Sequence, residues 1–240
     1  MTTYLKQALL FIAVIFFYSE AEAQTAVEAS QKFGKHFSAS VLLGPGIIAP
    51  AKSLEEGMRA NGFGHRSPEI CFFICIPETD YPKSNSGYSW MGKLTYHPDP
   101  HYGVSLMYSV YKFGDTIGYN STAGKLAIEH EMNSISPQLT LGFYDIISIS
   151  AGPALHSLKV QDRASHVYEI NRKLGVDADI SLRLPKKSLF FVTLDFSYML
   201  AGNYTIGPFT MTSNETTVTF SEVKVNYNQL TVNYGFGIRL

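Results

Sequence analysis

The stretch YGVSLMYSVY, residues 102–111, alternates large apolar side chains with Gly, Ser and Met. Successive side chains of a strand lie on opposite faces of a sheet, so a period of two predicts a strand with two unlike faces. The same alternation recurs in residues 174–184 and 230–240. The second face of the repeated strands is largely Gly, Ser, Thr and Asn, and such small residues suit a cramped, wet interior.

An apolar exterior around a polar interior is the arrangement of a transmembrane β-barrel. The alternation predicts strands at residues 37–48, 88–97, 102–112, 134–144, 146–158, 174–184, 188–200 and 229–240. Eight strands is the smallest common size for such a barrel. The sequence therefore predicts an all-β fold, an eight-stranded antiparallel up-and-down transmembrane β-barrel.

The predicted connections alternate in length. Short turns fall at 97–101, 144–146 and 184–188, and long connections fall at 49–87, 113–133, 159–173 and 201–228. Outer-membrane barrels have short periplasmic turns and long extracellular loops, so we expect the long connections outside the cell. Pro153 lies within the fifth predicted strand, and because proline cannot donate to the ladder we expect a bulge or a shorter strand there.

The beginning of the chain has the pattern of a secretory signal peptide. Lys6 precedes an apolar run at residues 8–18, and small residues follow up to Ala23. The run is too short to span a bilayer as a helix. We therefore expect a signal peptide at 1–23, a short periplasmic segment at 24–36 and an outer-membrane barrel domain at 37–240.

Composition agrees with a membrane location. Charged residues are 16% of the chain, aromatic residues are 13% and the net charge is −1. Soluble domains have about 25% charged residues. The near-neutral charge argues against a nucleic-acid partner. We expect outer-membrane lipid and the barrel-insertion machinery as partners, with a protein partner at the extracellular loops as a further candidate.

The two faces of the predicted barrel differ in charge. The outward face is uncharged at Trp90, Leu94, Tyr96, Leu139, Leu141, Phe143, Ile147, Ile149, Phe190, Val192, Leu194, Phe196, Val232, Tyr234, Phe236 and Ile238. An eight-stranded barrel is only wide enough for side chains to fill, and an unpaired buried charge is costly. We therefore expect a plugged lumen held by a charge network, and an ion path along the same groups is the alternative. The network residues are Lys93, Asp177, Asp179, Arg183, Asp195 and Arg239.

Cys71 and Cys75 lie in the first long connection. Exported cysteines usually pair, so we expect a disulfide, with the backbone turning helically across the three residues between them. The spacing is unlike that of a metal site. The apolar residues around them form a candidate contact loop, and the alternative, which we favour, is a loop that folds over the barrel mouth. These residues are Ile70, Phe72, Phe73, Ile74 and Ile76.

Two stretches carry a family resemblance. ISPQLTLGFY at 135–144 and ISAGPAL at 149–155 are a proline-containing strand and an Ala-Gly-Pro strand joined by a short turn. They resemble the paired strands of small PorT-like outer-membrane β-barrel proteins, and the likeness extends more loosely from about residue 37 to the YGFGI finish at 234–238. The general architecture is also similar to that of OmpX-like barrels. The resemblance implies an outer-membrane location and a barrel fold, and it implies no reaction.

We therefore predict a non-enzymatic outer-membrane barrel with no catalytic, cofactor or metal site. Its role would be structural, adhesive or export-assisting, through extracellular loops or as a partner in an envelope complex. One alternative is a lipid A-modifying enzyme, which needs a Ser and a His together. His156 and Ser157 are adjacent in a strand and face opposite ways, whereas His36 and Ser38 share a face near the periplasmic end. The other is a secreted lipocalin-like carrier, which would be apolar inside and charged outside.

Overall fold

The structure is a computed structural model. It describes residues 37–47, 51–67, 69–71, 74–76, 78–99, 101–143, 146–162, 167–185, 188–213 and 216–239. The predicted signal peptide and the segment at 24–36 lie outside these residues. Within the described part of the chain, no helix is long and apolar enough to cross a membrane.

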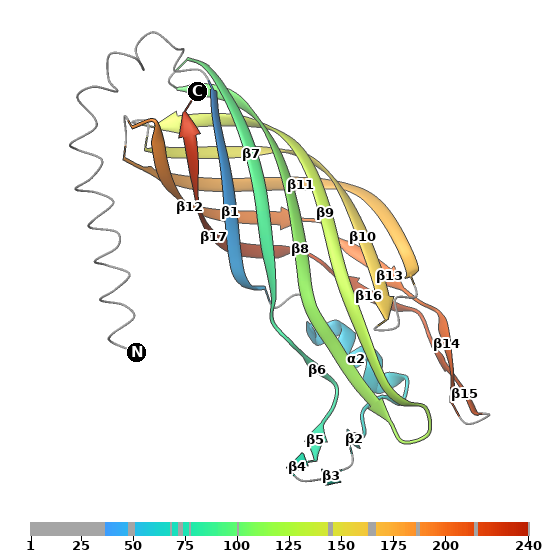
Figure 1. The fold of residues 1–240 in the computed structure, drawn as a ribbon. Coiled ribbons are helices and arrows are strands. Elements are labelled where there is room, and N and C mark those ends of the chain that lie inside the picture. Colours follow the sequence, from blue (N-terminus) through green and yellow to red (C-terminus); the bar gives the residue numbers. More distant parts are fainter. Residues whose placement is uncertain are drawn as a thin grey trace.

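Eight long strands form a closed ring (Figure 1). Every strand pairs antiparallel with both neighbours, and the ring closes where β17 pairs with β1. The predicted eight-stranded antiparallel barrel is therefore confirmed. The strands are β1 (Phe37–Ile47), β7 (Gly87–Asp99), β8 (Tyr102–Asn120), β9 (Gly124–Phe143), β10 (Ile147–Asp162), β11 (Val167–Leu184), β12 (Phe190–Leu200) and β17 (Gln229–Arg239).

Three of these strands, β8, β9 and β11, are much longer than predicted, and β10 runs four residues beyond its predicted end. Most of the connections expected at 113–133 and 159–173 is strand, because β8 and β9 continue to a turn at 121–123 and β10 runs to Asp162. The reason is an inversion of the alternation. Leu126, Ile128 and Met132 point inward and are buried, whereas Glu129 and Glu131 lie on the opposite face. Beyond the bilayer the wall faces water, so its apolar side turns inward.

The remaining elements lie at the end of the barrel away from the short turns (Figure 1). In the first connection, α2 (Ala51–Ala60) is followed by β2 (Arg66–Ser67), β3 (Ile70–Cys71), β4 (Cys75–Ile76), β5 (Thr79–Asp80) and β6 (Lys83–Ser84). β2 pairs with β5, β3 with β4 and β6 with β8. In the last connection, β13 (Asn203–Ile206) pairs with β16 (Val223–Asn226), and β14 (Phe209–Ser213) pairs with β15 (Thr216–Phe220).

These elements close the end of the barrel opposite the short turns with an apolar core, which we call the extracellular cap. Leu54 and Met58 of α2 are fully buried, and Phe63 lies 6.4 Å from Phe220 between ring centroids. Burial of large apolar side chains stabilises this end by about 1.5 to 3 kcal/mol for each. The core joins the inward side chains of the long strands with those of the loops. Its members include Phe113, Leu126, Ile128, Met132, Leu158, Val160, Tyr204, Ile206, Val225 and Tyr227.

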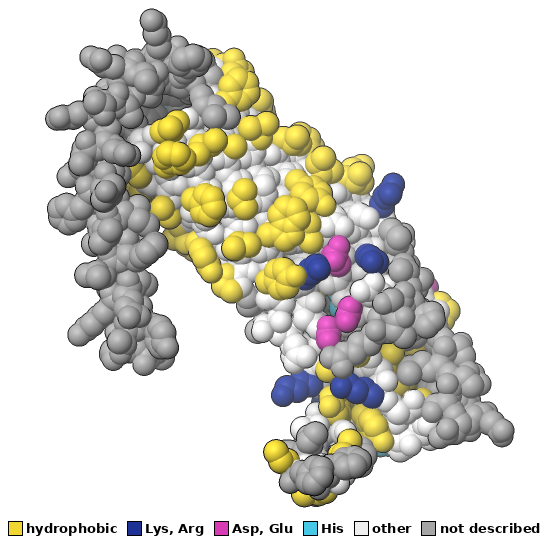
Figure 2. Space-filling view, viewed as in Figure 1, with side chains coloured by type: hydrophobic (Ala, Val, Ile, Leu, Met, Phe, Trp, Pro, Cys, Tyr) yellow, Lys and Arg dark blue, Asp and Glu magenta, His cyan; other side chains and the backbone are white. Residues whose placement is uncertain are grey.

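The outer wall carries a broad apolar band (Figure 2). Of the outward residues predicted from the alternation, all but the partly buried Ile238 are exposed large apolar side chains. Exposed apolar surface on this scale is unfavourable in water and favourable in hydrocarbon. On β9 the band covers Ile135 to Phe143, and it ends at Asn133 and Glu131. The band is the membrane-spanning surface of the barrel.

Pro153 lies in an unbroken strand, so the expected bulge or shortening is wrong. Pairing of β9 with β10 stops after Ala151–Leu139 and resumes at Leu155–Ile135 in the same register. That register sets Pro153 opposite Pro137, and neither has an N–H to donate. The Ser136 hydroxyl, 3.0 Å away, donates to the Pro153 carbonyl at this point. The wall therefore tolerates proline by placing two together.

Candidate functional site

The part of the lumen nearer the short turns contains a cluster of buried charges. Lys93 is 4% exposed and forms an ion pair with Asp179. Its ammonium also donates to Ser150 Oγ at 2.8 Å. Asp195 accepts hydrogen bonds from the hydroxyls of Ser181, at 2.6 Å, and Ser197. The small hydroxyl residues of the polar face therefore solvate the charges that the strands bring inside.

A second acidic group lies in the part of the lumen nearer the cap. Asp177 accepts a hydrogen bond of 2.7 Å from the Ser134 hydroxyl. His156 Nε2 lies 3.6 Å from Asp177 Oδ1. The imidazole fits because residue 175 is glycine, and a Cβ there would lie 2.7 Å from the ring. Asp177 and Asp179 are therefore held by different partners although they belong to the same strand.

Two arginines lie over the Phe191 ring at the periplasmic end. The guanidinium carbons of Arg183 and Arg239 lie 5.6 and 4.8 Å from the ring centroid. Arg239 also donates to the carbonyls of Pro185 at 3.1 Å and Ser188 at 2.7 Å. Arg239 therefore anchors the turn between β11 and β12, whereas Lys93, Asp179 and Asp195 lie further inside.

Gly237 leaves the space that the Phe191 ring occupies, because a Cβ at residue 237 would overlap that ring. We expect Gly237→Ala to lower the free energy of unfolding by about 1 to 3 kcal/mol, the usual cost of overpacking. The measurement is the temperature to which the sample must be heated in SDS before the folded band disappears from a gel run in the cold. Gly92→Ala is the matched control, since a Cβ there meets nothing within 4 Å. Equal behaviour of the two variants would contradict the packing described here.

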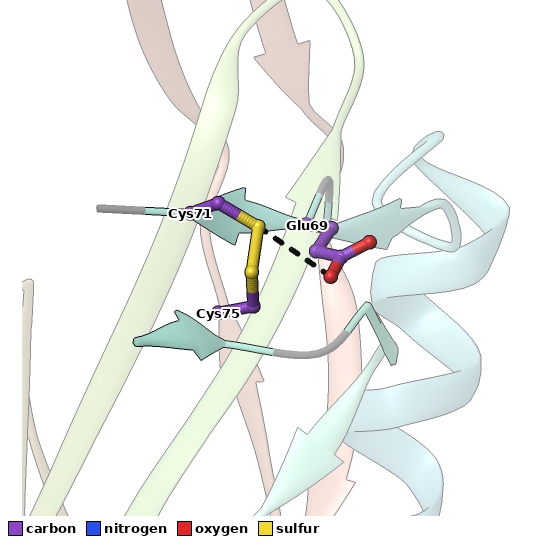
Figure 3. A group of neighbouring side chains, drawn as sticks. All are labelled: Glu69, Cys71 and Cys75. Carbon is purple, nitrogen blue, oxygen red and sulfur yellow. Dashed lines mark hydrogen bonds between the residues drawn. A yellow bond between two sulfur atoms is a disulfide. The ribbon is translucent and has the colours of Figure 1, made fainter. Parts of the chain in front are cut away.

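Cys71 and Cys75 form a disulfide across a small hairpin (Figure 3). They are directly paired in β3 and β4 with their Cα atoms 4.0 Å apart, so the expected helical turn is wrong. A pair opposed across two strands needs no helix to bring its sulfurs together. The Glu69 carboxylate lies 3.6 Å from Cys71 Sγ. These three residues are grouped closely, but sulfurs in a disulfide are not thiolate ligands for a metal.

The hairpin, residues 69–78, projects from the cap at the end furthest from the short turns (Figure 1). Arg66 holds its base, with Nε 2.7 Å from Asp80 and Nη1 3.7 Å from Glu78. Ile74 is 81% exposed and Ile70 is 50% exposed. The expectation that this loop folds over the barrel mouth is therefore wrong for both. Phe72, Phe73 and the side chain of Ile76 lie outside the described residues.

The cap contains a buried histidine that the sequence analysis did not single out. His130 Nδ1 lies 2.6 Å from the Tyr227 hydroxyl, and the two rings are 5.9 Å apart between centroids. His130 is inward on β9, five residues beyond Ile135, where the apolar band begins on this strand. Burial lowers its pKa from 6.5 to about 3. The inverted alternation, with His130 between buried Ile128 and Met132, is the signal that could have found it.

The low pKa of His130 makes cap stability depend on pH. The folded state keeps the imidazole neutral, whereas the unfolded chain binds a proton below about pH 6.5. The stabilisation is therefore complete above pH 6.5 and is lost as the pH falls towards 3, with a slope of about 1.4 kcal/mol per pH unit. We expect proteolysis of the cap in intact barrels to accelerate over this range in the wild type. His130→Phe should flatten the profile, and an unchanged slope would contradict this assignment.

The residues considered for an enzyme are kept apart. His156 is fully buried in the lumen, and Ser157 lies on the other face of β10. His36 lies outside the described residues. The inside of the lower barrel is polar and its outside apolar, which is the reverse of a lipocalin-like carrier.

No protein-family model matches the chain, and no curated protein matches its sequence. Several solved outer-membrane proteins match its fold. OprG from Pseudomonas aeruginosa is 12% identical, with 84% of this chain and 94% of OprG covered and a TM-score of 0.52. Ail, the attachment invasion locus protein of Yersinia pestis, is 11% identical over 85% of this chain and 99% of Ail, with a TM-score of 0.39. Neisserial surface protein A is 10% identical over 86% and 98%, with a TM-score of 0.40. The likeness to OprG shows the fold, that of a small outer-membrane β-barrel.

Proposed function

We propose that this protein is a non-enzymatic outer-membrane barrel with a plugged lumen that acts through its extracellular hairpin. The apolar band and the barrel fold support the membrane placement. The buried charges below and the apolar core above support the plug. The role of the hairpin as a contact is supported by its shape and surface.

The observation that carries this proposal is Ile74, which is 81% exposed at the tip of a cross-linked hairpin. The free energy falls when a partner covers a large apolar side chain that was exposed to water. Exposed apolar groups with polar surroundings mark interaction sites. The disulfide limits the conformations of the tip, so less entropy is lost when it binds.

The chemistry of the hairpin indicates a protein partner with an apolar pocket. Ile70 and Ile74 would enter the pocket, while Arg66, Glu78 and Asp80 form a polar rim around the base. An apolar centre inside a polar rim is the usual anatomy of a protein interface. An adhesive role and an export-assisting role both use such a contact.

The test is photo-crosslinking in intact cells with Ile74→p-benzoylphenylalanine. We expect a discrete covalent adduct with one protein, and its identity separates a surface ligand from an envelope partner. The matched control carries the same residue at Thr122, an exposed position in the β8–β9 turn. No adduct at residue 74, or the same adducts from residue 122, would overturn the proposal.

A further inference from the structure

A cleft interrupts the outer wall of the barrel just beyond the apolar band. Its volume is about 380 Å³. It lies where β8 shifts register between Phe113 and Thr116. Bulges at barrel rims often redirect side chains next to binding sites. Its lining includes Asn85, Tyr88, Lys112, Glu131, Lys159 and Gln161.

Two glycines let the backbone form the floor of this cleft. A Cβ at Gly87 would overlap the Lys112 carbonyl, and one at Gly114 would overlap the Asn85 carbonyl. The chain entering β7 and the bulged part of β8 therefore approach more closely than other residues would allow. The cleft lies where these two backbone segments cross.

The cleft lies at the edge of the apolar band, on the side towards the cap. In the register, Trp90, Val110 and Asn133 share one row, and Tyr88, Lys112 and Glu131 share the next accessible row outward. Trp90 and Tyr108 belong to the apolar band, and their rings pack 5.5 Å apart between centroids. Interfacial aromatic rings commonly mark the membrane boundary. Figure 2 shows basic and acidic side chains gathered just beyond the apolar band.

Two lysines flank one glutamate in this row, and the cleft lining also contains two further carboxylates, Asp115 and Glu129. Lys112 and Lys159 both pair in register with Glu131, one from each neighbouring strand. Lys112 Nζ lies 3.7 Å from Glu131 and 5.9 Å from the centre of the Tyr88 ring. Within the described residues, no ion pair to Lys159 is present. Arg172, exposed and paired with Ser157, adds a third cation nearby.

The acidic groups further out are differently placed. Glu129, one row beyond Glu131 on the same face, accepts a hydrogen bond of 2.9 Å from Gln161. In the strand register, Glu131 lies between the two lysines. A phosphate group between Lys112 and Lys159 would exchange a loose ion pair for contacts with two ammonium groups.

We infer that this cleft binds the phosphate-bearing headgroup of an outer-leaflet lipid. Lys112 and Lys159 contact the phosphate, and Tyr88, Asn85 and Gln161 contact the rest of the headgroup. Basic residues beside a membrane surface recognise anionic lipid headgroups in this way. The inference rests on the proposed membrane placement, but it is independent of the hairpin contact.

Trp90 provides the measurement, because it is the only tryptophan in the chain and lies in β7 two residues from Tyr88. The full chain in detergent is titrated with diphosphoryl lipid A while the emission of Trp90 is followed. We expect a saturable change that is weaker with the dephosphorylated lipid. Full binding of free glucosamine 1-phosphate at the same concentration would overturn the lipid as the source of the phosphate.

Removing the lysines and removing Glu131 should change the affinity for the lipid in opposite directions. Lys112→Gln and Lys159→Gln should each weaken binding about fivefold, which corresponds to about 1 kcal/mol for each cation. Glu131→Gln removes the competing carboxylate and should tighten binding, whereas lysines that serve only to pair with Glu131 would give no such gain. Lys125→Gln, exposed at the distal end of β9, is the control. Unchanged affinity in both lysine variants would overturn the inference.

The same samples distinguish a failure of lipid binding in the cleft from a failure of the membrane placement. A heat-dependent shift in SDS electrophoresis that persists in the lysine variants shows that the barrel is intact, so that lost affinity reports on the cleft. Absence of the shift in the wild type would instead count against the membrane placement.

Discussion

Replacement of Lys93 by methionine is expected to lower the free energy of unfolding of the barrel by about 3 to 5 kcal/mol. The variant leaves Asp179 buried without its ion-pair partner, and a second carboxylate, Asp195, is close by, because the Ser181 hydroxyl lies 3.2 Å from Asp179 and 2.6 Å from Asp195. Unpaired buried charge is among the most costly defects in a folded protein. The measurement is urea unfolding of the refolded barrel in phospholipid vesicles, followed by Trp90 fluorescence.

A double variant separates the loss of the ion pair from the cost of leaving Asp179 buried and unpaired. Lys93→Met combined with Asp179→Leu removes both charges, and replacement of a buried ion pair by apolar side chains is often neutral. We expect the double variant to recover most of the lost stability. A single variant as stable as the wild type would contradict a closed, dry lumen. It would indicate that water reaches Asp179.

The second large effect is expected on the outer wall. Leu139 is 72% exposed in the middle of the apolar band, between Val104 and Ala151 on the adjacent strands. Leu139→Arg should therefore cost about 2 to 4 kcal/mol in a bilayer. The readout is the yield of heat-resistant folded barrel after refolding into vesicles.

Asn133→Arg is the matched control, because Asn133 lies on the same face of β9 at the edge of the band. Its cost should be about 0 to 1 kcal/mol, as is found near the interface. If both arginines cost the same, the apolar band would not be the membrane-spanning surface.

Most of the membrane part of this fold could be predicted from the sequence. Period-two alternation with large apolar residues outward located all eight ring strands, because lipid demands an uninterrupted apolar face. Strand ends were misplaced at the extracellular side because the pattern reverses there. Residues such as Leu126 and Ile128 read as loop only when the exterior is assumed to be apolar everywhere.

The sites were less predictable than the fold. Lys93, Asp177, Asp179, Arg183 and Asp195 could be placed inside because each lies on the polar face of a predicted strand. Their partners could not, since contacts across the lumen depend on register between distant strands. The cap was missed because its core joins α2 to β13–β16 through side chains far apart in the chain. The exposure of Ile74 depends on the hairpin direction, which local sequence does not encode.

Electrophoretic mobility of the membrane-extracted protein in SDS, with and without boiling, is the sharpest test of a closed barrel in the membrane. A closed barrel resists SDS at room temperature and unfolds on heating, so we expect a membrane-fraction band that changes mobility on boiling. A protein found in the soluble fraction with the same mobility under both conditions would contradict a closed, lipid-embedded barrel.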